Sequence, residues 1–121
     1  TPLYSSAASD VYKRQILEGV KGFMEYEMIS EKELDRLLEK EQGFVIDLRS
    51  PLEYAAYHIP GAVNIPYERL KKVRGLPKNV PLIFYCERGS VSMVAAREMA
   101  EKGYRAKSLT GGIHSWHRRL G

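Results

Sequence analysis

The sequence predicts one α/β domain built on a largely parallel sheet. Short apolar runs alternate with helical patterns from Ile16 onward, which is the order that a parallel sheet with crossover helices requires. The chain has 121 residues, 44% of them apolar, which is enough for a single core and too little for two full domains. No internal repeat or low-complexity stretch interrupts this order.

Residues 1–15 are predicted to stand outside the domain, which we expect to span residues 16–121. The segment shows neither helical nor strand periodicity. Residues 10–15, DVYKRQ, resemble the translation of a transposon adaptor used in DNA sequencing. We therefore expect a non-native or disordered tail.

The first half of the domain is predicted to hold three strands and three helices. Strands are expected at 24–29, 44–48 and 62–64, and helices at 31–41, 51–57 and 67–72. Ser30 and Ser50 each precede a glutamate by three residues, which predicts a capping box at the start of a helix. Gly43 should end the first helix.

The second half is predicted to hold the most buried strand. Residues 80–85, VPLIFY, form the most apolar segment, which suits a central strand covered on both faces. The helix that follows Gly89 should bury one apolar face, made of Val91, Val94, Ala95 and Met99. Gly103 is expected as its left-handed C-cap. A strand at 106–109, a turn at Gly111 and Gly112 and a helix at 113–120 complete the order.

Composition limits the chemistry open to the chain. Cys86 is the only cysteine, which excludes an intrachain disulfide and a CxxC redox pair and indicates a reducing, cytoplasmic setting. No apolar stretch approaches the ~20 residues of a membrane span, so we expect no membrane partner. The formal net charge of +4 permits nucleic acid or an anionic substrate and singles out neither.

Cys86 follows the predicted strand 80–85, at the carboxyl edge where parallel sheets bind their ligands. Residues 86–92, CERGSVS, lead into the next helix, so backbone amides and the helix N-terminus should surround the sulfur and favour the nucleophilic thiolate. Gly89 lets the loop turn, and Arg88 adds a positive charge. A buried, inert thiol has no use for this charged turn, so we interpret Cys86 as reactive.

Three segments together resemble the rhodanese-like domain, a family of single-domain sulfurtransferases. They are residues 45–54 with 58–62 (VIDLRSPLEY and HIPGA), the loop 86–92, and the C-terminal residues Gly103, Tyr104, Gly111, Gly112, Ile113 and Trp116. The resemblance implies a three-layer fold with a central, mostly parallel five-stranded sheet and helices on both faces.

The resemblance also implies an activity. Cys86 would take a sulfane sulfur from thiosulfate or another persulfide donor, hold it as a persulfide, and pass it to a thiol or a protein acceptor, with no cofactor and no metal. The residues implied to bind the substrate are the rest of the loop: Glu87, Arg88, Gly89, Ser90, Val91 and Ser92.

Asp47 and Arg49 match the family's DxR segment, which lies near the active loop and is implied to organise the pocket. The residues alone favour a plainer hypothesis, a salt bridge between Arg49 and Glu53 within one capped helix, because ion pairs at helix ends are common. His58 belongs to the chain-turning HIPGA segment and is not expected to be a general base. His114 and His117 have no third ligand nearby and are expected to be solvated rather than metal-binding.

The loop departs from the family at Val91, where many members have arginine. Thiosulfate recognition should therefore differ, either with Arg88 holding the anion or with a persulfide as donor. Tyrosine phosphatases also hold a thiolate over a helix N-terminus, but their arginine six residues after the cysteine is Ser92 here, which disfavours phosphoryl transfer. A non-catalytic binding module is the remaining alternative, and the intact Cys86 argues against it.

Overall fold

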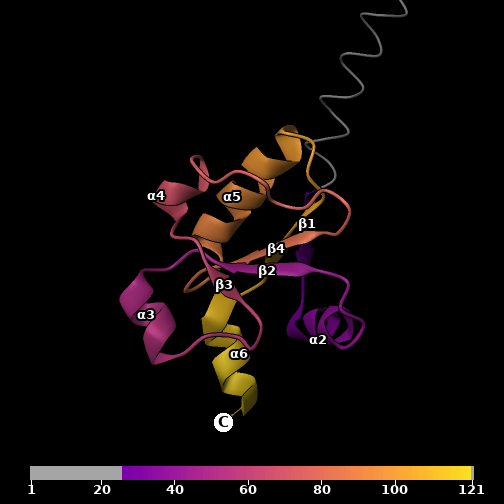
Figure 1. Ribbon diagram of the computed structural model, residues 1–121. Coiled ribbons are helices and arrows are strands. Elements are labelled where there is room, and N and C mark those ends of the chain that lie inside the picture. The colour runs from indigo at the N-terminus through magenta and orange to yellow at the C-terminus, as the bar shows by residue number, and fades with distance from the viewer. Residues whose placement is uncertain (1–25, 121) are drawn as a thin grey trace, which may run out of the picture.

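Five strands form one sheet in the order β1-β5-β4-β2-β3, and every neighbouring pair is parallel (Figure 1). The computed structural model describes residues 26–120, and the side chains up to Trp116. The expected tail 1–15 and the first two residues of the expected strand 24–29 lie outside this range. The strands are β1 Tyr26–Ile29, β2 Phe44–Asp47, β3 Val63–Asn64, β4 Leu82–Tyr85 and β5 Ala106–Leu109.

Helices cover both faces of the sheet, as predicted. They are α2 Glu31–Glu39, α3 Pro51–Ala56, α4 Tyr67–Leu70, α5 Ser90–Glu101 and α6 Gly112–Leu120. Helices α4 and α5 lie over one face, and α2 and α6 lie over the other (Figure 1). The three-layer α/β fold class is confirmed. None of the helices described is long and apolar enough to cross a membrane.

Strand β4 is the central strand, as its apolar sequence predicted. Ile83 and Tyr85 face the core beneath α2 and α6, whereas Leu82 and Phe84 face the core beneath α5. All four side chains are fully buried. The strand therefore ends in a rigid position, and the residue that follows it is Cys86.

Helices α2 and α3 begin at the predicted serines. Ser50 and Glu53 form a complete capping box, with each side chain accepting the other residue's amide proton. At α2 only half of the box forms: Ser30 accepts from the Glu33 amide, and the Glu33 carboxylate meets the Ser30 hydroxyl instead of its amide.

Helix α2 ends two residues before the predicted limit. Glu41 adopts a left-handed φ of 52°, and the amides of Glu41 and Gln42 bond back to the carbonyls of Leu38 and Leu37. This is a Schellman ending, so the chain has already left the helix before Gly43. Gly43 instead allows close packing, because a Cβ there would lie 2.4 Å from Ile83 Cδ1.

The apolar face predicted for α5 is partly wrong. Ala95 and Met99 are buried, but Val91 and Val94 are exposed. The buried stripe consists instead of Ser92, Ala95, Ala96, Met99 and Ala100. These side chains are mostly small, which lets α5 pack close to the sheet. The stripe also brings a polar residue, Ser92, beneath the loop that begins at Cys86. Gly103 has the predicted left-handed φ, 94°.

Candidate active site

Cys86 lies between the end of β4 and the start of α5, with 5% of its surface exposed. Its Sγ accepts the amide proton of Gly89 at 3.1 Å and that of Ser92 at 3.4 Å. Among the described residues, these two loop amides are the ones that donate to the sulfur. Donors fixed around a buried sulfur stabilise negative charge there, so the arrangement suits a thiolate.

Backbone amides at the N-terminus of α6 donate to carbonyls of the active loop. The Ile113 amide donates to the Cys86 carbonyl at 2.9 Å, and the His114 amide donates to the Glu87 carbonyl at 3.2 Å. Gly112 makes this approach possible, because a Cβ on it would lie 2.3 Å from the Cys86 carbonyl oxygen. The glycine pair was predicted only as a tight turn. It also lets one helix end anchor the carbonyls of the active loop.

Gly89 turns the loop as predicted. Its φ of 104° is left-handed, and a Cβ would lie 3.2 Å from the Gly111 amide. A side chain at this position would therefore be strained and would press on the turn before α6. The turn aims the Gly89 amide at Cys86 Sγ and its carbonyl at the first turn of α5.

Two fully buried serines continue inward from the sulfur. Ser92 Oγ lies 3.6 Å from Cys86 Sγ and 2.7 Å from Ser108 Oγ, and it donates to the Gly89 carbonyl at 3.1 Å. Ser92 was named from sequence as a loop residue, but Ser108 was not. Nothing in the pattern of strand 106–109 marked Ser108, because its role comes from the pairing of β5 beside β4.

The other side chains of the loop are exposed to solvent. They belong to Glu87, Arg88, Ser90 and Val91, and none of them hydrogen-bonds to Cys86 among the described residues. Arg88, expected to add positive charge at the sulfur, has no ion pair or hydrogen bond in the part of the chain described.

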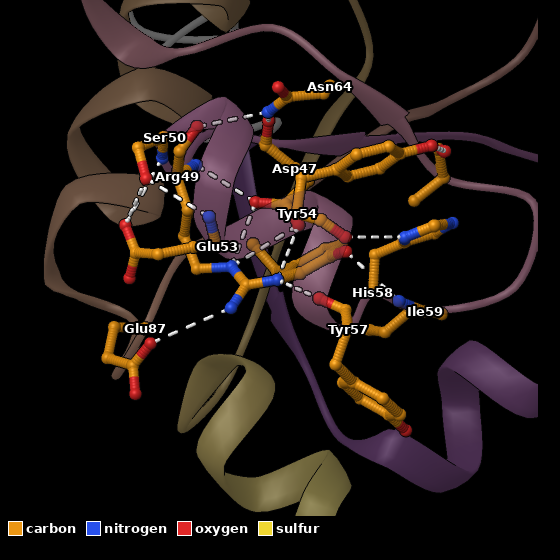
Figure 2. A network of polar contacts seen from close by, with 12 residues as sticks. Asp47, Arg49, Ser50, Glu53, Tyr54, Tyr57, His58, Ile59, Asn64 and Glu87 are labelled. Carbon is orange, nitrogen blue, oxygen red and sulfur yellow. Dashed lines mark hydrogen bonds and ion pairs between the residues drawn. The ribbon is translucent and has the colours of Figure 1, made fainter.

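Asp47 and Arg49 form a buried ion pair beside this loop (Figure 2). Asp47 has no exposed surface, and its carboxylate accepts from the Arg49 backbone amide at 2.9 Å and from Nη2 at 2.8 Å. The same Nη2 donates to the Tyr57 carbonyl at 2.6 Å, and Nη1 lies 3.8 Å from Glu87 in the loop. The pair thus joins β2, the end of α3 and the active loop.

The expected salt bridge between Arg49 and Glu53 is wrong. The Glu53 carboxylate accepts from the Ser50 amide and hydroxyl, at 3.2 and 2.9 Å, and so serves the helix cap. Arg49 turns inward because the buried Asp47 carboxylate needs a compensating charge. The alternative drawn from the family resemblance, a position beside the active loop, agrees with the geometry.

Tyr85, the residue before Cys86, belongs to the same buried network as Asp47 and Arg49. Its hydroxyl accepts the Ile59 amide at 3.1 Å, and the Arg49 guanidinium lies 5.8 Å from the centre of its ring. Burial, reinforced by Asp47, raises the pKa of Tyr85 far above its usual value. Burial disfavours the charge of Arg49, but hydrogen bonds and attraction from Asp47 outweigh it and raise the pKa of Arg49.

Among the described side chains, neither His58 nor His114 hydrogen-bonds to Cys86. His58 Nδ1 lies 2.8 Å from the Tyr54 carbonyl, and its ring stacks on Tyr54 with centroids 3.7 Å apart, in keeping with the chain-turning role expected for it. His114 is exposed, and the side chain of His117 lies outside the described part. The described residues contain no cluster of three or more groups able to hold a metal ion.

Fold and site together define a parallel α/β domain that presents one cysteine between a central strand and a helix N-terminus. The chain belongs to the rhodanese-like domain family, whose profile matches residues 30–119. It is 33% identical over 104 residues to a tRNA sulfurtransferase of Desulfurococcus amylolyticus, covering 86% of this chain and 19% of that protein.

Two shorter relatives match over most of their length. A protein named Sulfurtransferase from Allochromatium vinosum is 33% identical over 94 residues, covering 76% of this chain and 88% of the relative. The human single-domain sulfurtransferase TSTD1 has a TM-score of 0.68 at 27% identity, covering 76% of this chain and 96% of that one. The chain thus spans about a fifth of the tRNA sulfurtransferase and most of the other two. These relatives support a transferase.

Proposed function

We propose that this domain is a sulfurtransferase that carries a sulfane sulfur on Cys86 as a persulfide. The observation that carries the proposal is the Cys86 sulfur, buried at the end of β4 with the Gly89 and Ser92 amides directed at it. Such a cradle stabilises the anionic sulfur on which both halves of a sulfur transfer depend. The names of the relatives point to the same reaction class.

In the first half-reaction the Cys86 thiolate attacks the outer sulfur of thiosulfate. The S–S bond of the donor breaks, its electron pair leaves with sulfite, and a new bond joins Sγ to the transferred sulfur. A persulfide donor would react in the same way and release a thiolate. The outer sulfur of the resulting persulfide carries the negative charge.

In the second half-reaction a nucleophile such as cyanide or a thiolate attacks the outer sulfur. The bond from that sulfur to Sγ breaks, and its electron pair returns to Cys86 as thiolate. Donor and acceptor each meet the enzyme in turn, so the kinetics are ping-pong. Neither half-reaction, as written, requires an electron acceptor, a cofactor or a metal.

The remaining site residues receive roles under this proposal. The loop from Glu87 to Ser92 surrounds the outer sulfur and the donor. Arg49, held in place by Asp47 and by the Tyr57 carbonyl at the end of α3, supports the loop through Glu87. The acceptor is cyanide, a small thiol or a thiol of an acceptor protein, each of which can attack the outer sulfur as a nucleophile. A cytoplasmic setting, expected from the single cysteine, stays a prediction.

Intact-mass spectrometry tests the proposal. The protein is incubated with excess thiosulfate, or with a low-molecular-weight persulfide, and then freed of donor. We expect a mass gain of one sulfur atom, which cyanide removes with the release of thiocyanate. A second sample treated with cyanide alone should keep the original mass.

The control is Cys86→Ser, which should gain no sulfur and transfer none. The hydroxyl of serine is smaller than the thiol, but it removes no carbon atom and can make the same hydrogen bonds, so this variant should keep its fold. An unchanged circular dichroism spectrum would show that lost activity does not come from unfolding. Sulfur transfer that persists in Cys86→Ser, or wild-type protein that never gains sulfur from either donor, would contradict the proposal.

A further inference from the structure

The buried hydroxyls of Ser92 and Ser108 lie where they can respond to the charge on Cys86. Both serines have no exposed surface, and their oxygens are 2.7 Å apart. Ser92 belongs to the first turn of α5 and Ser108 to β5, so two elements distant in sequence bring them together. Polar groups this deeply buried carry a cost unless each of their hydrogen bonds is made.

The hydrogen bonds of the thiol form can be assigned completely. A hydroxyl has one proton to donate and two lone pairs that accept. Ser92 Oγ donates to the Gly89 carbonyl at 3.1 Å and accepts from the Cys86 thiol at 3.6 Å. Because the single proton of Ser92 is thus used, the short contact of 2.7 Å must be donated by Ser108. Ser92 Oγ is then fully satisfied.

The thiolate form requires only one rotation. When Cys86 has lost its proton, the Ser92 hydroxyl can turn from the Gly89 carbonyl to Sγ. The carbonyl is not left bare, because the Met93 amide also donates to it, at 3.2 Å. Ser108 donates to Ser92 Oγ in both states and so holds that oxygen in place while its proton moves.

We propose that Ser92 is a catalytic residue that donates a hydrogen bond to Cys86 Sγ as negative charge forms there, and that Ser108 is the positioning residue that keeps Ser92 in reach. The inference rests on the proposed sulfurtransferase function. Its effect belongs to the second half-reaction, in which Sγ changes from a neutral bridging sulfur to a leaving thiolate. A donor that strengthens only as this charge develops stabilises the transition state more than the persulfide.

The test measures sulfur release from the preformed persulfide. Wild-type protein and variants are loaded with sulfur, their loading is quantified by intact mass, and the rate of thiocyanate formation is measured with excess cyanide. A hydrogen bond to a charged group corresponds to about one to two orders of magnitude in rate. We therefore expect Ser92→Ala to slow release by at least about ten-fold, and Ser108→Ala to slow it by a smaller factor.

The double variant separates positioning from independent action. If Ser108 acts only through Ser92, then Ser92→Ala/Ser108→Ala releases sulfur no more slowly than Ser92→Ala alone. Ser92→Thr keeps the hydroxyl and should recover most of the rate. As the matched control, Ser30→Ala removes a serine hydroxyl that caps α2, so it should lower thermal stability and leave the release rate unchanged.

Each outcome decides the question. Equal release rates in wild type, Ser92→Ala and Ser108→Ala would overturn the serine proposal and leave the sulfurtransferase proposal intact. Additive losses in the double variant, or losses in Ser30→Ala as large as those in Ser92→Ala, would overturn the positioning role. Wild-type protein that takes up no sulfur would overturn the sulfurtransferase function and this inference with it.

Discussion

Glycine 112 shows how one missing side chain shapes the active loop. Its φ is +60°, and a Cβ would lie 2.3 Å from the Cys86 carbonyl oxygen and 2.7 Å from that of Glu87. We expect Gly112→Ala to destabilise the fold by well over the ~1–2 kcal/mol that a left-handed alanine costs. The variant should also lose persulfide formation, because the loop backbone must move away from α6. Urea unfolding and intact mass check both effects.

The matched control for this variant is Gly75→Ala. Gly75 has a similar φ of +82°, but nothing lies within 4 Å of a Cβ built on it. It should therefore show the backbone strain alone, with a loss of ~1–2 kcal/mol and normal sulfur uptake. If the two variants lost equal stability and equal activity, the contact with the loop carbonyls would have no special role.

Val91 provides the second prediction for a single residue. The side chain is 39% exposed, so an arginine fits there without displacing the core. Thiosulfate is a dianion, and a charge-assisted hydrogen bond to it corresponds to about 10- to 100-fold in kcat/KM. We expect thiosulfate to be a poor donor for the wild type, with a high KM, and Val91→Arg to raise kcat/KM for it in steady-state assays.

Two further variants separate a specific contact from a general change of charge. Val94→Arg adds the same charge at an equally exposed valine of α5, outside the loop, and should have little effect. Arg88→Ala tests the alternative that Arg88 already contacts the donor. A sharp loss in Arg88→Ala with no gain in Val91→Arg would assign donor recognition to Arg88. No change in either variant would show that neither position recognises the donor's charge.

At the scale of elements, the Asp47–Arg49 pair connects β2 to the end of α3 and to the active loop. Both side chains are almost fully buried, and removing one partner would leave an uncompensated charge. We expect Arg49→Met to lower the free energy of unfolding by about 3–5 kcal/mol, as is typical when a buried pair is broken. Urea unfolding monitored by Trp116 fluorescence measures this.

Glu53→Ala is the informative comparison for that pair. Glu53 caps α3 and makes no ion pair with Arg49 among the described contacts, so its removal should cost only about 0.5–2 kcal/mol. Comparable losses in Glu53→Ala and Arg49→Met would favour the salt bridge that the sequence pattern suggested.

The partner of Arg49 could not be predicted from local sequence patterns. The strands at 44–47 and 106–109, the Ser50 cap and the position of Cys86 follow from periodicity and capping chemistry, which act over a few residues. Arg49 lies within four residues of both Asp47 and Glu53 in the sequence. Only the burial of Asp47 in the finished sheet decides which of the two carboxylates Arg49 pairs with. Ser108 was missed for the same reason, because only strand pairing brings it to Ser92.

At the scale of the whole molecule, the active loop is held from several directions. Strand β4 ends at Cys86, β5 supplies Ser108, the N-terminus of α6 binds two loop carbonyls, and Arg49 reaches Glu87 from the end of β2. These segments come together only when the sheet has formed. The geometry around the sulfur therefore depends on the complete fold, and global unfolding should abolish sulfur transfer in step with the loss of tertiary structure.

Tyr85, at the centre of the sheet, makes the stability of the whole fold sensitive to high pH. Burial raises the pKa of Tyr85, with a further contribution from Asp47, whereas the Ile59 amide and Arg49 oppose the rise. The folded protein thus keeps the phenol neutral, while the unfolded chain ionises near pH ~10. This contribution to stability is complete below that pH and is lost as the pH rises above it, at about 1.4 kcal/mol per pH unit.

The Tyr85→Phe variant cannot ionise at this position, so it measures how much the ionisation of Tyr85 changes the free energy of unfolding. The variant loses the acceptor for the Ile59 amide, so we expect it to be less stable than wild type at neutral pH by about 1–3 kcal/mol. Above pH ~10, however, its free energy of unfolding should fall less steeply, by about 1.4 kcal/mol per pH unit, so the two curves converge. Urea unfolding at a series of pH values measures both slopes. Parallel curves would mean that Tyr85 ionises as readily in the fold as in the unfolded chain, and that its burial does not link the core to pH.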